Sequence, residues 1–75
     1  MISVKVIHQR SGNPVKGKKV ALGINALFSG GVTHGEWTDS QGEAHFNVKP
    51  SNGKVFIDGS VKFEGHLSGQ IVVYI

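Results

Sequence analysis

A turn and a strand meet in nine residues near the middle of the chain, Thr38-Asp39-Ser40-Gln41-Gly42-Glu43-Ala44-His45-Phe46. The Asp39 carboxylate can accept hydrogen bonds from backbone amides just ahead of it, and Gly42 tolerates the positive φ of a tight turn. From Glu43 to Val48, polar and apolar residues then alternate, which is the period of a strand with one buried face. The stretch therefore predicts a turn that feeds directly into a half-buried strand.

The same alternation extends along the chain in both directions, and helical periodicity is nearly absent. Turns are expected at Gln9–Pro14, at Pro50–Gly53, at Asp58-Gly59 and over Glu64–Gly69, because these segments combine Gly, Pro, Asn, Asp and Ser. The strands expected between them cover residues 2–6, 18–24, 32–38, 43–48, 55–57, 61–63 and 70–75. About seven short strands with near-zero helix predict an all-β sandwich or small barrel that fills one domain, residues 1–75.

Composition narrows the possible classes of protein. The chain has 75 residues, 11 Gly, no Cys and a formal net charge of +3. The absence of Cys excludes a disulfide scaffold and a zinc–thiolate fold. The longest fully apolar run, Ile71–Ile75, is far shorter than the ~20 residues that span a bilayer, and no signal peptide is visible after Met1. We therefore expect a cytoplasmic protein without a membrane partner.

Two stretches carry a family resemblance: Val4–Ile7 followed by Ser11–Leu22, and Thr38–Phe46. They resemble carboxypeptidase regulatory-like and transthyretin-like (prealbumin-like) domains, which are small immunoglobulin-like β-sandwiches. The resemblance covers roughly residues 2–48 and rests on the corner residues Gly12 and Pro14 and the turn residues Asp39 and Gly42. It implies a fold more strongly than a function. Members of this superfamily are mostly non-catalytic modules that bind or stabilise other proteins.

One enzymatic branch of the superfamily, resembling 5-hydroxyisourate hydrolase, has a catalytic His on the first strand, seven residues before the turn glycine. That position is Lys5 in this chain, and the branch's Tyr-Arg-Gly-Ser terminus is replaced by Val72-Val73-Tyr74-Ile75. The sequence therefore predicts a non-catalytic binding or structural module, with no catalytic residue, no cofactor and no metal ligand assigned.

Two other function classes remain as alternatives. The four histidines, His8, His34, His45 and His66, could serve a small metal-binding or hydrolytic enzyme, because neutral imidazole is a common metal ligand. No pair of them has ligand spacing, so we expect them to be surface residues. The basic run Lys16-Gly17-Lys18-Lys19 could bind nucleic acid weakly, but a net charge of +3 makes such a partner unlikely.

The last strand suggests a protein partner. Ile71, Val73 and Ile75 lie on one face, whereas Val72 and Tyr74 lie on the other, so both faces are apolar. Such a strand is buried from both sides, either as a central strand or by contact with another chain. We expect a homo-oligomer, most simply a symmetric dimer, with Ile71, Val73 and Ile75 as interface candidates.

Trp37 and Phe28 are two further interface candidates. A single Trp in an all-β domain most often fills the core, which is the expected role of Trp37, and an exposed partner anchor is the alternative. Phe28 precedes the loop Ser29-Gly30-Gly31 and raises the same question.

Overall fold

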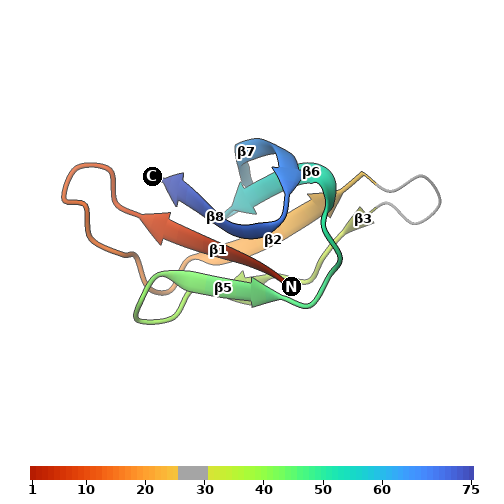
Figure 1. Ribbon diagram of the computed structural model, residues 1–75. Coiled ribbons are helices and arrows are strands. Elements are labelled where there is room, and N and C mark those ends of the chain that lie inside the picture. Colours follow the sequence, from red (N-terminus) through yellow and green to blue (C-terminus); the bar gives the residue numbers. More distant parts are fainter. Residues whose placement is uncertain (26–30) are drawn as a thin grey trace.

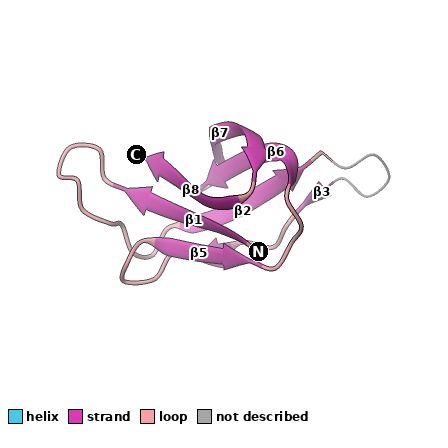
Figure 2. Cartoon of the chain, viewed as in Figure 1, coloured by secondary structure: helices cyan, strands magenta, loops and turns pink. Residues whose placement is uncertain are grey.

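The chain forms eight strands and no helix within the residues that the computed structural model describes, 1–25 and 31–75 (Figure 2). The strands are β1 (Ile2–Ile7), β2 (Lys19–Ile24), β3 (Gly31–Val32), β4 (Glu36–Trp37), β5 (Glu43–Phe46), β6 (Ser51–Ile57), β7 (Ser60–Leu67) and β8 (Gly69–Tyr74). The prediction of an all-β protein is confirmed for this part of the chain.

The strands form two sheets (Figure 1). A three-stranded sheet has the order β5-β1-β8, in which β1 runs antiparallel to β5 and parallel to β8. A larger five-stranded sheet has the order β3-β2-β6-β7, with β4 also paired to β2, and all its pairs are antiparallel.

One hydrophobic core joins the two sheets. Along β1, β2, β5, β6 and β8 every second residue points inward, as the period of two requires. The inward faces predicted for residues 2–6, 20–24 and 44–48 are confirmed, although Ile24 and Val48 are only partly buried. The buried core residues are Ile2, Val4, Val6, Val20, Leu22, Ala44, Phe46, Val55, Ile57, Leu67, Ile71 and Val73.

The turn before β5 has the predicted chemistry. Asp39 Oδ1 accepts hydrogen bonds from the backbone N–H groups of Gln41 (2.9 Å) and Glu43 (3.0 Å). Gly42 adopts a φ of 77°, and a Cβ there would lie 2.6 Å from the carbonyl oxygen of Val6. Glycine is therefore required at this position both for its conformation and for close packing against β1.

The other predicted turn residues also take the expected roles. Gly12 has a φ of 75°, and Pro14 forms an isolated bridge to Ile7 at the corner after β1. Asp58 and Gly59 have φ values of 49° and 85°, which is the pattern of the type I′ turn in a tight hairpin. This hairpin joins β6 to β7.

The single strand expected over residues 32–38 is wrong in detail. The structure has two short strands there, β3 and β4, separated by Thr33–Gly35. Thr33 interrupts the ladder because its side chain replaces a backbone acceptor: Thr33 Oγ1 accepts the hydrogen bond from the Leu22 N–H (2.9 Å). The alternation of polar and apolar residues gave no sign that a side chain would take the place of a backbone acceptor here.

Two predicted turns are in fact parts of strands. The turn expected at Pro50–Gly53 is wrong because β6 begins at Ser51, and Gly53 lies inside the sheet, opposite Ile24 and Gly65. The loop expected over Glu64–Gly69 is also wrong. Strand β7 continues to Leu67, and only Ser68 separates it from β8.

Candidate functional site

Strand β8 lies at the edge of the three-stranded sheet. It pairs with β1 on one side, so the prediction's alternative of a central strand is wrong. Ile71 and Val73, which we named as interface candidates, point into the chain's own core and are only 7% and 3% exposed. The partly buried Ile75 packs against the same core. An interface on this strand would therefore be made by the other face, where Val72 is 43% and Tyr74 is 61% exposed.

The backbone of β8 also has a free side. The Ile75 N–H donates to Ile7 O (2.9 Å), and Ile75 O accepts from the Gln9 N–H (2.8 Å), so both backbone groups of Ile75 face β1. Since the backbone groups of successive residues in a strand point to opposite sides, those of Val72 and Tyr74 face away from β1. We call this side the β8 edge. No other described strand pairs with it.

A second apolar surface covers the outer face of the larger sheet. Trp37 lies opposite Lys19 in the ladder between β4 and β2, and it is 64% exposed. Its expected role as a core residue is therefore wrong. The same sheet has a hollow with a volume of about 540 Å³, which is lined by Lys19, Ala21, Val32, Phe56, Asp58 and Gly59.

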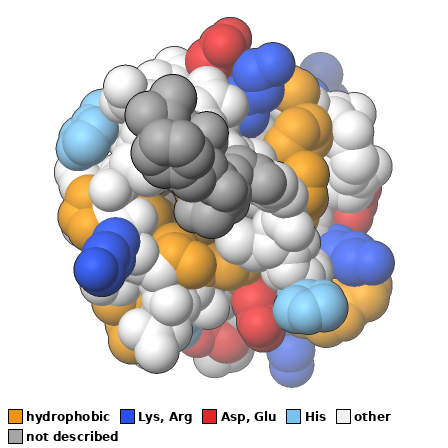
Figure 3. All heavy atoms as spheres, turned by 90° about the vertical axis from the view of Figure 1, so that its right-hand side faces the viewer, with side chains coloured by type: hydrophobic (Ala, Val, Ile, Leu, Met, Phe, Trp, Pro, Cys, Tyr) orange, Lys and Arg blue, Asp and Glu red, His pale blue; other side chains and the backbone are white. Residues whose placement is uncertain are grey.

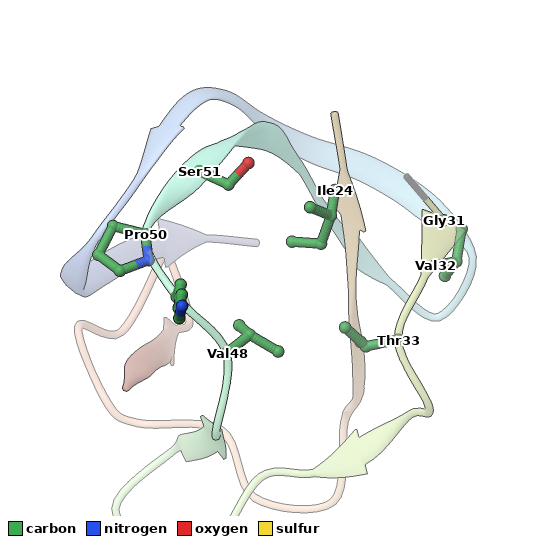
Figure 4. Close-up of a pocket in the computed structure, with 8 residues that line it drawn as sticks. Ile24, Gly31, Val32, Thr33, Val48, Pro50 and Ser51 are labelled. Carbon is green, nitrogen blue, oxygen red and sulfur yellow. The ribbon is translucent and has the colours of Figure 1, made fainter. Parts of the chain in front are cut away.

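A second hollow lies at the end of the molecule where β2, β3 and the segment before β6 come together. Ile24, Thr33 and Val48 point into it, and its volume is about 520 Å³ (Figure 4). Hydrophobic side chains reach the surface at this end among charged and polar ones (Figure 3). Phe28, an interface candidate, lies outside the described residues, as do its neighbours 26–30, so no role is assigned to it or to this hollow.

Polar side chains gather on the outer face of the three-stranded sheet, where the turn Asp39–Gly42 leads into β5. One possible ligand atom from each of Asp39, Glu43 and His45 lies within 4.8 Å of those from the other two. His45 Nε2 is 3.6 Å from Glu43 Oε1, and His45 Nδ1 is 2.8 Å from Ser3 Oγ, to which it is hydrogen-bonded. We refer to Asp39, Glu43 and His45 as the β5 cluster.

Sequence reasoning missed the β5 cluster because it searched for pairs of histidines. The signal that could have found it is Glu43-x-His45, since residues two apart on a strand share a face. The other histidines do not join it: His66 Nδ1 lies 3.0 Å from Asn52 Oδ1 on the larger sheet. The described residues therefore do not bring the four histidines together.

The electrostatics of the β5 cluster favour an ionised Asp39. The backbone N–H of Glu43 lowers the pKa of the Asp39 carboxyl below its ordinary value of 3.8, and the Gln41 N–H and the nearby His45 act in the same direction. Desolvation opposes this shift only in part.

The basic run contributes less free charge than its sequence suggests. Lys18 Nζ forms an ion pair with Asp58 Oδ2 at 3.3 Å, and the Lys19 N–H donates to Asp58 Oδ1. Lys19 itself lies on the outer face of the larger sheet. Lys18 is therefore partly neutralised, which weakens the case for a phosphate-binding patch.

No helix that could span a membrane occurs in the described part of the chain. Comparison with protein-family models, with curated proteins and with solved structures found no match for this chain. The case for its function therefore rests on the surfaces described above.

Proposed function

We propose that this chain is a non-catalytic, transthyretin-like β-sandwich module that works by binding, and that its partner at the β8 edge is a second copy of itself. The observation that carries the proposal is the β8 edge: no other described strand pairs with it, and the strand has exposed apolar residues and no charged side chain. The transthyretin-like assignment is supported by the turn motifs around Pro14 and Asp39, which take their expected geometry in a two-sheet fold.

An unprotected edge strand invites pairing with another strand. Soluble proteins commonly protect such an edge with Lys, Pro or a bulge. The segment Gly69–Ile75 contains no proline and no charged residue. Because this strand carries no charged side chain, two copies of β8 meet without repulsion between like charges at the contact. A second β8 is therefore a better occupant of this edge than a charged peptide.

The geometry selects a particular register for the two copies. The outward backbone groups belong to Val72 and Tyr74, so these residues form the hydrogen-bonded pairs in an antiparallel contact. A twofold axis at Val73 places Val72 of each copy opposite Tyr74 of the other. Each such pair of an aromatic and a β-branched side chain contributes about 0.2–1 kcal/mol, and the two three-stranded sheets join into one sheet of six.

Sedimentation equilibrium over a wide range of protein concentrations tests the proposal. We expect the wild-type chain to show a reversible monomer–dimer equilibrium, and Val72→Pro to remain monomeric. Proline at this position removes an outward N–H and leaves the bonds to β1 intact, so the fold should survive, as the circular dichroism spectrum will show. Val61→Lys is the matched control, because it alters an exposed valine on β7, the edge strand of the other sheet.

Three results would contradict the proposal: a wild-type chain that stays monomeric at the highest concentration, a folded Val72→Pro variant that dimerises normally, or a dimer lost in Val61→Lys alone. The last result would assign self-association to the larger sheet. That sheet is the second candidate surface because Trp37 lies exposed on it, and aromatic residues dominate binding energy at interfaces.

A further inference from the structure

The three members of the β5 cluster reach one point from a turn and a strand. Glu43 and His45 lie two residues apart on β5, so both side chains stand on the outer face of the sheet. Asp39 lies at the start of the turn that leads into β5, and its carboxylate folds back toward them. One imidazole nitrogen and two carboxylates are thus held within 4.8 Å of one another.

Each member of the cluster also makes hydrogen bonds that fix the position of its side chain. The Ser3 hydroxyl on β1 is hydrogen-bonded to His45 Nδ1 (2.8 Å), and Gln70 Nε2 on β8 donates to Glu43 Oε2 (3.3 Å). Backbone N–H groups occupy Asp39 Oδ1. Such outer hydrogen bonds orient the ligands of metal sites, and here they direct His45 Nε2 toward Glu43 Oε1.

From this convergence we propose that the β5 cluster binds one divalent first-row transition-metal ion, Zn²⁺ being the reference case. Imidazole and carboxylate together suit these ions, and three protein ligands leave the remaining positions to water. When Nδ1–H donates to Ser3, the lone pair of Nε2 lies 3.6 Å from Glu43 Oε1, and a cation bound between them relieves their repulsion.

A proton is the competing occupant of this position. A protonated His45 would form an ion pair with Glu43 at the observed 3.6 Å without any metal. A metal ion and a proton make opposite predictions. A metal site takes up one added ion per chain, whereas an ion pair between His45 and Glu43 needs no added ion.

Lys5 is a positively charged residue on the same face of the sheet as the β5 cluster. It lies directly opposite Glu43 in the ladder between β1 and β5. Its ammonium group repels a bound cation, so Lys5→Gln should strengthen metal binding, whereas loss of a ligand should weaken it. This opposite effect of two substitutions on one face distinguishes a real site from general attraction of cations to the surface.

Isothermal titration calorimetry with ZnCl₂, in parallel with NMR of the histidine rings, tests the inference. We expect one Zn²⁺ per chain, a perturbed His45 ring, at least tenfold weaker binding in His45→Asn, and a few-fold tighter binding in Lys5→Gln. His34→Asn is the matched control, because this exposed histidine lies outside the cluster.

Glu43→Gln gives a second test, since it keeps the side chain's shape and should also weaken binding about tenfold. The inference is overturned if the wild-type chain binds no Zn²⁺, if His45→Asn and His34→Asn weaken binding equally, or if several ions bind with similar weak affinity. It does not depend on self-association, because the readout is ion binding per chain.

Discussion

Thr38 provides the sharpest test of how this fold is held together. It is the one buried polar side chain among the described residues, and its hydroxyl makes two hydrogen bonds. Oγ1 donates to Val15 O (2.7 Å) and accepts from the Lys18 N–H (2.9 Å). These bonds fasten the connection before β2 to the connection before β5. Thr38→Val keeps the side-chain volume but leaves both backbone groups without this partner.

The expected magnitudes follow from the two bonds. A partly buried backbone group left unsatisfied costs about 1–1.5 kcal/mol here, so Thr38→Val should lower the free energy of unfolding by about 2–3 kcal/mol. Thr38→Ser keeps the hydroxyl and loses one methyl group, at a cost of about 0.8 kcal/mol. With a urea m-value of ~1 kcal/mol/M for a chain of this size, the midpoints should fall by about 2–3 M and 1 M.

Urea unfolding followed by far-ultraviolet circular dichroism is the appropriate assay, because Trp37 is already 64% exposed and its fluorescence would respond weakly. Equal destabilisation by Thr38→Val and Thr38→Ser would refute the reasoning. In that case the methyl group, and not the hydroxyl, would carry the contribution of Thr38.

Two further predictions concern a close backbone approach and a titrating turn. Gly53→Ala should destabilise the fold by about 1–3 kcal/mol or more, because the new Cβ would collide with the Gly23 carbonyl oxygen. The control, Gly31→Ala, adds a methyl group to open space and should change the stability by less than about 0.5 kcal/mol. Thermal melts of both variants check this, and equal melting temperatures would contradict it. The folded-state pKa of Asp39 lies below 3.8, so its stabilising contribution is present above pH 3.8 and is lost as the pH falls through the folded-state pKa. Unfolding measured across this acid range should therefore depend less on pH in Asp39→Asn than in the wild-type chain, and identical profiles would exclude this role for Asp39.

Much of the fold could be predicted because local chemistry and tertiary packing agree. In β1 and β2 the alternation of side chains indicates which face is buried, and Val4 and Leu22 are both fully buried as it predicts. The turns at Asp39–Gly42 and Asp58-Gly59 were predictable because positive φ values demand particular residues there.

The errors in the prediction have one common cause. At Thr33 a side chain replaces a backbone acceptor, and at Gly53 a glycine serves close sheet packing where the sequence suggested a turn. In both cases the deciding contact is with a residue on another strand. A reading of neighbouring residues cannot contain that information.

The candidate sites were harder to predict for the same reason. The inward or outward direction of Ile71 and Val72 depends on which sheet β8 joins, and its parallel pairing with β1 is a long-range event. Trp37 is exposed because Lys19, its partner across the ladder, is on the outer face. Sequence identified these residues as unusual, but only the pairing of strands assigned their faces.

The two proposed sites occupy opposite edges of one small sheet, which lets each operate without the other. In a dimer centred on Val73 the two copies meet through the outward backbone groups of Val72 and Tyr74, whereas the side chain of Gln70 reaches the other way, to Glu43, and keeps that bond. The β5 cluster then lies about 10 Å from the dimer contact, two strand spacings away, and its open side still faces water. Metal binding should therefore leave the dimerisation constant unchanged. A dimer that strengthens with Zn²⁺ would instead mean that the ion bridges two copies, which the register centred on Val73 does not allow.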